Sequence, residues 1–167
     1  EWRMRLDNLN RPLYDLKVNH DQFASELQKE CNWFSGVADS VFKKVFPLLN
    51  DFHFSPRENH AISMAFGAKL AGANPAVLIQ NSGLGLSLDA LLGTFTLYKQ
   101  GLLLVVSNRG TLQWEEIQHQ DWGKITCKLL KAMDIPFLSL NDLGVEAIAR
   151  CSEIAFKKNK VCVLLIE

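Results

Sequence analysis

Nine polar residues that could do chemistry fall in short segments that follow apolar runs: Asp39, Ser40, Glu58, Gln80, Asn81, Ser82, Arg109, Gln118 and His119. The carboxylates and the imidazole can exchange protons with a substrate. The amides and hydroxyls can orient a ligand through hydrogen bonds, and the guanidinium can hold an anion by two parallel hydrogen bonds. This mixture suggests a site for a small polar molecule.

Glu58 heads the segment "ENHAISMAFGAKLAG", whose apolar residues recur at helical spacing and whose side chains are largely small. A carboxylate in the first turn of a helix complements the helix dipole and stabilises it by about 0.3–1 kcal/mol. For an isolated Glu that structural role is the ordinary interpretation, and only the other segments of the chain can change it.

The segment "QNSGLG" (80–85) invites comparison with phosphate-binding glycine loops. Gly83 and Gly85 form a GxG pair, but the third glycine of the dinucleotide fingerprint and the lysine of the P-loop are missing. No acidic residue stands at the end of a second strand to hold a ribose. Close packing of a strand against a helix explains the glycine pair at least as well, so a nucleotide-binding function is disfavoured.

Two alternating periods predict the elements that position these residues. The runs "NWFSGV", "FHF", "PAVLIQ", "LLLVVS", "IPFLSL" and "VCVLLIE" have the pattern of strands, most of them buried on both faces. Helical patterns lie between them, over residues 20–31, 40–49, 58–71, 84–99, 122–133 and 143–157. This alternation predicts a three-layer α/β/α domain over residues 20–167 with a mostly parallel central sheet, preceded by an arm over residues 1–19.

In such a sheet the loops at the carboxyl ends of the strands lie along one edge. These loops are expected over residues 35–40, 55–58, 80–85 and 107–123. They contain all nine polar residues, so we expect the nine to form one site.

Composition excludes several classes of partner. The 167 residues are 48% hydrophobic, and 18 basic residues balance 18 acidic ones, so we expect no nucleic-acid or membrane partner. No apolar run approaches the ~18 residues of a membrane span. Cys31, Cys127, Cys151 and Cys162 lie far apart without a CxxC pair. We therefore expect no metal site in this chain, and reduced thiols in a cytoplasmic protein.

Four segments in order resemble the pyrimidine-binding domain of thiamine-diphosphate-dependent decarboxylases, in particular the phosphonopyruvate and sulfopyruvate decarboxylases. "FSGVADSVFKKVF" (34–46) is similar to that family's "GVPDSLLK", with an alanine where the family has proline. "ENHAISMAFGAKLAG" (58–72) resembles its Glu-headed helix, and "VLIQNSGLG" (77–85) matches its "QNSGLGN". Residues 109–137 match its Arg-Gly and Gln-His motifs, so the resemblance covers roughly residues 20–167.

The resemblance implies that Glu58 hydrogen-bonds N1′ of the aminopyrimidine ring of thiamine diphosphate. A carboxylic acid that shares a proton with N1′ favours the imino tautomer, which can take the proton from C2 of the thiazolium ring. The catalytic role of Glu58 thereby becomes the preferred interpretation over the dipole role.

For the other loops, the resemblance implies further roles in one site. Asp39, Ser40 and His119 are expected to act in proton transfer, and Arg109 with Gln118 in substrate binding. Cofactor contacts are expected from Gln80, Asn81, Ser82 and Gly83. Alternatives stay open: Ser40 as a helix N-cap, His119 as an exposed loop histidine, and Arg109 as a structural residue. Glu115 and Glu116 would disfavour a dianionic substrate unless they point away.

The sequence has no Gly-Asp-Gly motif, which in this superfamily holds Mg2+ and the diphosphate. The resemblance therefore implies a diphosphate-binding beta subunit or domain that carries the Mg2+, in a hetero-oligomer. The expected substrate is a small anionic 2-oxo acid. "GVADS" and "QH" favour 3-phosphonopyruvate, converted to phosphonoacetaldehyde and CO2, with sulfopyruvate as the alternative substrate. A non-catalytic interaction module that retains the fold is the remaining alternative.

Overall fold

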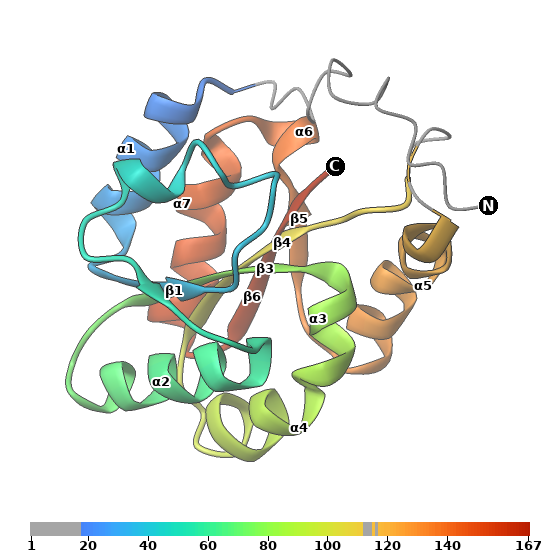
Figure 1. Cartoon of the computed structure of the whole chain (residues 1–167). Coiled ribbons are helices and arrows are strands. Elements are labelled where there is room, and N and C mark those ends of the chain that lie inside the picture. The colour runs from blue at the N-terminus through green and yellow to red at the C-terminus, as the bar shows by residue number, and fades with distance from the viewer. Residues whose placement is uncertain (1–17, 112–114, 116) are drawn as a thin grey trace.

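The computed structural model describes residues 18–111, 115 and 117–167. In this part of the chain, six parallel strands form one sheet in the order β2-β1-β3-β4-β6-β5 (Figure 1). The strands are β1 (Trp33–Gly36), β2 (His53–Phe54), β3 (Pro75–Gln80), β4 (Leu102–Ser107), β5 (Phe137–Ser139) and β6 (Val161–Ile166). The predicted parallel sheet is confirmed.

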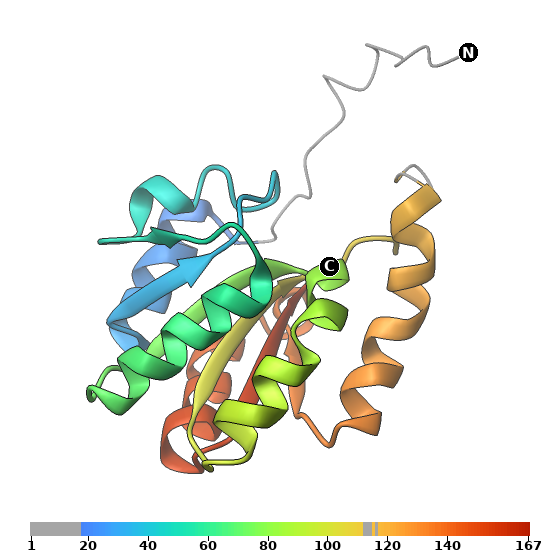
Figure 2. The same cartoon turned by 60° about the horizontal axis from the view of Figure 1, so that its bottom comes forward.

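Helices cover both faces of this sheet, as Figure 2 shows. The described helices are α1 (His20–Glu30), α2 (Glu58–Leu70), α3 (Asn81–Leu86), α4 (Leu88–Leu91), α5 (Ile117–Ala132), α6 (Leu140–Leu143) and α7 (Glu146–Ser152). Helices α1, α6 and α7 pack on one face, whereas α2, α3, α4 and α5 pack on the other. The three-layer α/β/α architecture is therefore confirmed.

The central strands are buried on both faces because each contributes alternate side chains to two cores. On β4, Leu103 and Val105 join the core beneath α1 and α7, while Leu102 and Leu104 join the core beneath α2 and α5. Every residue of β4 and β6 is buried. This double burial explains why both strands read as uninterrupted apolar runs.

The predicted helix over residues 40–49 is wrong. The segment is a run of turns that ends in a 3-10 turn, Phe46–Leu48. The Val45 N–H donates to the Phe42 carbonyl at 2.8 Å, a bond across three residues rather than four. Pro47 has no N–H with which to continue a helix. The apolar spacing that suggested a helix instead reflects burial of the turns against the sheet.

The helix predicted from residue 143 begins at Glu146 as α7, after the separate short helix α6. Helices α3 and α5 begin earlier than their predicted starts at residues 84 and 122, namely at Asn81 and Ile117. Their first turns are mostly polar or glycine residues, so the apolar period on which the prediction relied becomes visible only one turn later. As a consequence, "QNSGLG" is not a loop, and the loop after β4 is shorter than predicted.

The predicted arm over residues 1–19 lies mostly outside the described residues. Its last two residues are described: Val18 is buried, and Asn19 caps α1 by accepting a hydrogen bond from the Asp21 N–H at 2.7 Å. Within the described ranges, no helix is both long and apolar enough to cross a bilayer.

Candidate active site

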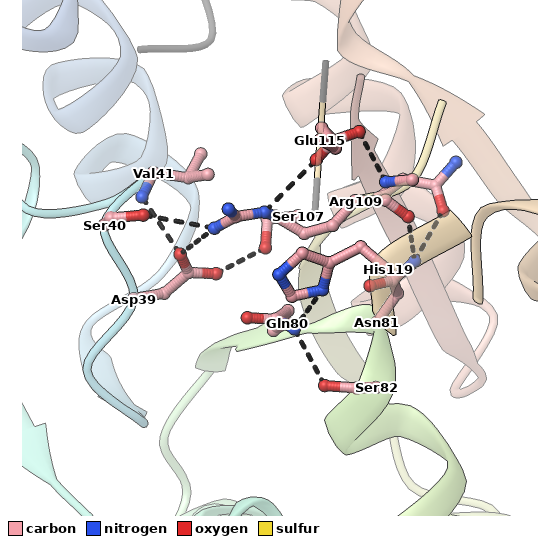
Figure 3. A network of polar contacts seen from close by, with 12 residues as sticks. Asp39, Ser40, Val41, Gln80, Asn81, Ser82, Ser107, Arg109, Glu115 and His119 are labelled. Atoms are coloured by element: carbon pink, nitrogen blue, oxygen red, sulfur yellow. Dashed lines mark hydrogen bonds and ion pairs between the residues drawn. The ribbon is translucent and has the colours of Figure 1, made fainter. Parts of the chain in front are cut away.

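Seven of the nine polar residues predicted to form a site gather at the carboxyl edge of β1, β3 and β4, which are neighbours in the sheet (Figure 3). Glu58 has no hydrogen bond or ion pair to this group, and the Gln118 side chain lies outside the described part. Asp39 and Ser40 follow β1, Gln80 ends β3, and Arg109 follows β4. The ends of these three strands lie side by side, because Gly36 of β1 pairs with Leu78 of β3 and Gln80 of β3 pairs with Ser107 of β4.

Asp39 is a hydrogen-bond acceptor that joins three segments. One carboxylate oxygen accepts from the Val41 N–H at 3.0 Å and from Arg109 Nη1 at 3.4 Å. The other accepts from the Ser107 hydroxyl at 2.5 Å. Only 3% of the side chain is exposed. Asp39 also makes the local turn bond, and no α-helix begins here, so the alternative of Ser40 as a helix N-cap is wrong.

Arg109 lies between two carboxylates. Its Nη1 contacts Asp39 and donates to Ser40 Oγ at 3.1 Å, while its Nε lies 3.3 Å from Glu115 Oε1. The Glu115 side chain is fully buried, and its other oxygen accepts from the Gly110 N–H at 2.5 Å. Glu115 therefore points toward the site and pairs with the cation there, a contact that the sequence did not predict. Glu116 lies outside the described residues.

His119 lies on the first turn of α5 and is 7% exposed, so the alternative of an exposed loop histidine is wrong. Its Nδ1 is 3.2 Å from Gln80 Nε2, which also donates to Ser82 Oγ at 2.9 Å. An amide N–H can only donate, so Nδ1 is the acceptor and a neutral imidazole carries its proton on Nε2. Gln118 lies beside His119 on α5, and its side chain is outside the described part.

Asn81 links three elements of the site through buried hydrogen bonds. It is fully buried, and its amide nitrogen contacts Asn108 Oδ1 at 3.1 Å, the Arg109 carbonyl at 2.8 Å and Thr126 Oγ1 at 3.1 Å. These contacts join the start of α3 to the end of β4 and to α5. The cofactor contact expected of Asn81 stays a prediction. Thr126 gave no signal in the sequence, because it lies inside a helix among ordinary surface residues.

The loop after β4 can approach α5 closely because Gly110 meets the helix backbone. Gly110 has φ +95°, and a Cβ there would collide with the His119 carbonyl. Gly123, on α5, is a helix residue that Gly110 packs against, and a Cβ on Gly123 would lie only 2.5 Å from the Gly110 backbone. The glycine pair thus holds Arg109 and His119 in one neighbourhood.

Glu58 begins α2, and its side chain lies against Gly83 at the start of α3. A Cβ on Gly83 would be 2.5 Å from Glu58 Oε1 and closer still to Cγ and Cδ. The Glu58 carboxylate is half-buried and makes no hydrogen bond or ion pair with another described residue. The Glu58 carboxylate is therefore held in position against Gly83, and both of its oxygens can still form hydrogen bonds with a ligand.

Comparison with known proteins identifies relatives. No family model matches the chain. It is 35% identical to sulfopyruvate decarboxylase subunit alpha of Methanococcus maripaludis over 149 residues, which span 84% of this chain and 89% of that one. It is 32% identical to the same subunit of Methanothermobacter thermautotrophicus over 66% of this chain and 68% of that one. The subunit of Methanocaldococcus jannaschii is 40% identical over 81 residues, 48% of this chain and 47% of that one.

The chain belongs to the sulfopyruvate decarboxylase alpha-subunit family. The predicted resemblance to thiamine-diphosphate-dependent decarboxylases, and to their pyrimidine-binding domain, is confirmed. The fold agrees with a solved 2-oxoglutarate:ferredoxin oxidoreductase from Magnetococcus marinus. The TM-score is 0.66 at 17% identity, over 87% of this chain and 28% of that chain. At this identity the likeness concerns the fold.

The described residues of this alpha-subunit family member fit the pyrimidine end of thiamine diphosphate. A carboxyl group that shares a proton with a ring nitrogen must not be engaged by a cation of the protein. Glu58 meets this condition, and Gly83 leaves the room in which its side chain is seated. Among the described residues, no group of three or more His, Cys, Asp or Glu side chains is placed to hold a metal ion.

Proposed function

We propose that this chain is the pyrimidine-binding subunit of a thiamine-diphosphate-dependent sulfopyruvate decarboxylase, which converts sulfopyruvate to sulfoacetaldehyde and CO2. Its relatives carry that enzyme's name, and one of them matches over 89% of its length. The word "subunit" in those names supports a hetero-oligomer. In this proposal a diphosphate-binding beta subunit holds the diphosphate and Mg2+.

The observation that carries the proposal is the seated and otherwise unengaged carboxylate of Glu58. When bound, thiamine diphosphate supplies a nucleophilic carbon that adds to the keto group of a 2-oxo acid. Glu58 contributes by holding a proton at N1′ of the pyrimidine ring. Its half-buried position limits competition from water for that proton.

His119 is the second functional group in the proposal. The bond from Gln80 fixes the orientation of the imidazole and leaves its proton on Nε2. In this tautomer His119 can donate a hydrogen bond from Nε2 to an oxygen of the substrate, which orients the substrate without transfer of the proton. Asp39 has a different role, because both of its oxygens already accept hydrogen bonds. It orients Arg109 and Ser40 and is a positioning residue.

The charges around Arg109 favour a sulfonate over a phosphonate. The carboxylates of Asp39 and Glu115 lie 3.4 Å and 3.3 Å from the Arg109 guanidinium. A sulfonate has a single negative charge, whereas a phosphonate approaches two, so the phosphonate is repelled more strongly. In the motifs that favoured 3-phosphonopyruvate, Asp39 and Ser40 of "GVADS" and His119 of "QH" already make contacts within the protein. Sulfopyruvate is therefore the preferred substrate.

The test is an assay of the complex purified with its partner subunit, with sulfopyruvate and 3-phosphonopyruvate as competing substrates and CO2 release as the readout. We expect thiamine-diphosphate-dependent turnover of sulfopyruvate, with a higher kcat/KM than for the phosphonate. Glu58→Gln keeps the shape but not the acid, so it should lower kcat by at least about 100-fold. Glu153→Gln, at an exposed helix position, is the matched control.

Two results would overturn the proposal. One is a complex that assembles with the cofactor and its partner yet leaves both oxo acids intact. The other is a Glu58→Gln complex with wild-type turnover. Titration of the isolated chain with thiamine diphosphate and Mg2+ should give weak binding, because this chain is proposed to bind only the pyrimidine end of the cofactor.

A further inference from the structure

A pocket of about 510 Å³ lies beside Asp39 and Ser40, on the side of the turn that follows β1. Its apolar walls come from Phe46, Pro47 and Phe54, while Asp39, Ser40 and Lys43 supply its polar lining. The rings of Phe46 and Phe54 meet edge to face with their centroids 5.1 Å apart, yet Phe54 is 59% exposed. The volume is in the range of small-ligand sites. The pocket is therefore a concave, mostly apolar space that opens next to the site.

One cation lines this pocket, and it is Lys43. Lys43 is exposed and makes no ion pair or hydrogen bond with another described residue. Arg109 differs, because Asp39 and Glu115 already surround its guanidinium. An anion that approached Arg109 would meet two carboxylates with it. In the pocket that Lys43 lines, Asp39 is the one carboxylate among the lining residues, and both of its oxygens already accept hydrogen bonds. Among the residues that line this pocket, Lys43 is thus the cation whose charge is left for a ligand.

The surroundings of Lys43 favour a sulfonate. The Ser40 hydroxyl accepts from Arg109 at 3.1 Å and keeps its own proton to donate. The ammonium group of Lys43 can donate a charge-assisted hydrogen bond to a sulfonate oxygen beside the apolar walls. The same walls suit the methylene group that joins the sulfonate to the keto carbon of the substrate.

We propose that Lys43 is the specificity-determining residue that binds the sulfonate tail of the substrate, in the pocket walled by Phe46, Pro47 and Phe54, with Ser40 as a second donor. This inference rests on the proposed function and names the subsite of its substrate. It also replaces Arg109 as the expected anion-binding residue, because the carboxylates beside Arg109 give it a positioning role.

The chain provides a matched pair of variants for the test. Lys43 and Lys44 are adjacent and both exposed, but only Lys43 lines the pocket. In the complex with the partner subunit, Lys43→Gln should raise the KM for sulfopyruvate by about 10- to 100-fold, the range for a lost charge-assisted hydrogen bond. The inhibition constant of sulfoacetate, a probe for the tail, should rise by a similar factor, while kcat falls far less.

Lys44→Gln should leave both constants at their wild-type values, and Lys43→Arg should restore most of the affinity because it keeps the charge. A KM for Lys43→Gln within twofold of wild type would overturn the inference while leaving the proposed function intact. Equal effects at Lys43 and Lys44 would also overturn it, since they would indicate a non-specific electrostatic effect of positive charge instead of a binding subsite at Lys43. A wild-type complex that fails to decarboxylate sulfopyruvate would refute the proposed function, and the inference with it.

Discussion

Replacing Gly83 by alanine tests whether the seating of Glu58 matters for activity. The new Cβ would lie 2.5 Å from Glu58 Oε1, whereas ordinary van der Waals contact begins at 3.4 Å. The carboxylate must therefore move by roughly 1 Å, and a misplacement of that size can cost about 100-fold in rate. We expect Gly83→Ala to lower kcat by that order and to weaken the binding of thiamine diphosphate.

The cost in stability should be small by comparison. The atoms that the new methyl group meets belong to the flexible Glu58 side chain, and Gly83 does not have a positive φ. We therefore expect about 1 kcal/mol at most, the low end for overpacking. The assay measures sulfopyruvate turnover and cofactor affinity of the assembled complex, together with its thermal unfolding.

Gly67→Ala is the control, because Gly67 lies on the same helix as Glu58 and a Cβ there meets nothing within 4 Å. Alanine in an exposed helix position should raise stability by about 0.5–1 kcal/mol without changing turnover. The reasoning would be refuted by a Gly83→Ala complex that assembles normally and turns over within threefold of wild type. Loss of activity in both variants would equally refute it, because the effect would then not depend on contact with Glu58.

Further predictions concern stability and thiol reactivity. Arg109→Met should cost about 3 kcal/mol or more in urea unfolding, because it removes the cation that pairs with two buried carboxylates. Arg150→Met breaks an exposed helical pair and should cost less than about 1 kcal/mol. At pH 8 a thiol reagent should modify the half-buried Cys127 before the buried Cys31; the reverse order would contradict the burial of Cys31. Burial raises the pKa of the Cys31 thiol above its ordinary value of 9.0, so the unfolded chain loses that proton first. The stabilisation from Cys31 should therefore be present below pH 9 and decline above it, and Cys31→Ala should flatten that decline in unfolding measured against pH.

The successes and failures of the sequence analysis have one physical cause. Strands buried on both faces must be continuously apolar, so β4 and β6 could be found from composition alone. The segment after β1 also has buried residues at helical spacing, but Pro47 and the side chain of Asp39 organise it as turns. The spacing of apolar residues indicates which residues are buried, but it does not determine which backbone hydrogen bonds they form.

The fold class and the family could be read from the sequence, because each depends on residues that are close together in the chain. The catalytic role of Glu58 stays a prediction. Only the tertiary structure decided the partners of those residues. Arg109 meets Ser40 across 69 positions, and Gln80 meets His119 across 39. The parallel register brings such loops to one edge, and only there does it emerge that Arg109 is held by carboxylates while Lys43 is not. No local pattern encodes that difference, since electrostatic pairing depends on distance in space.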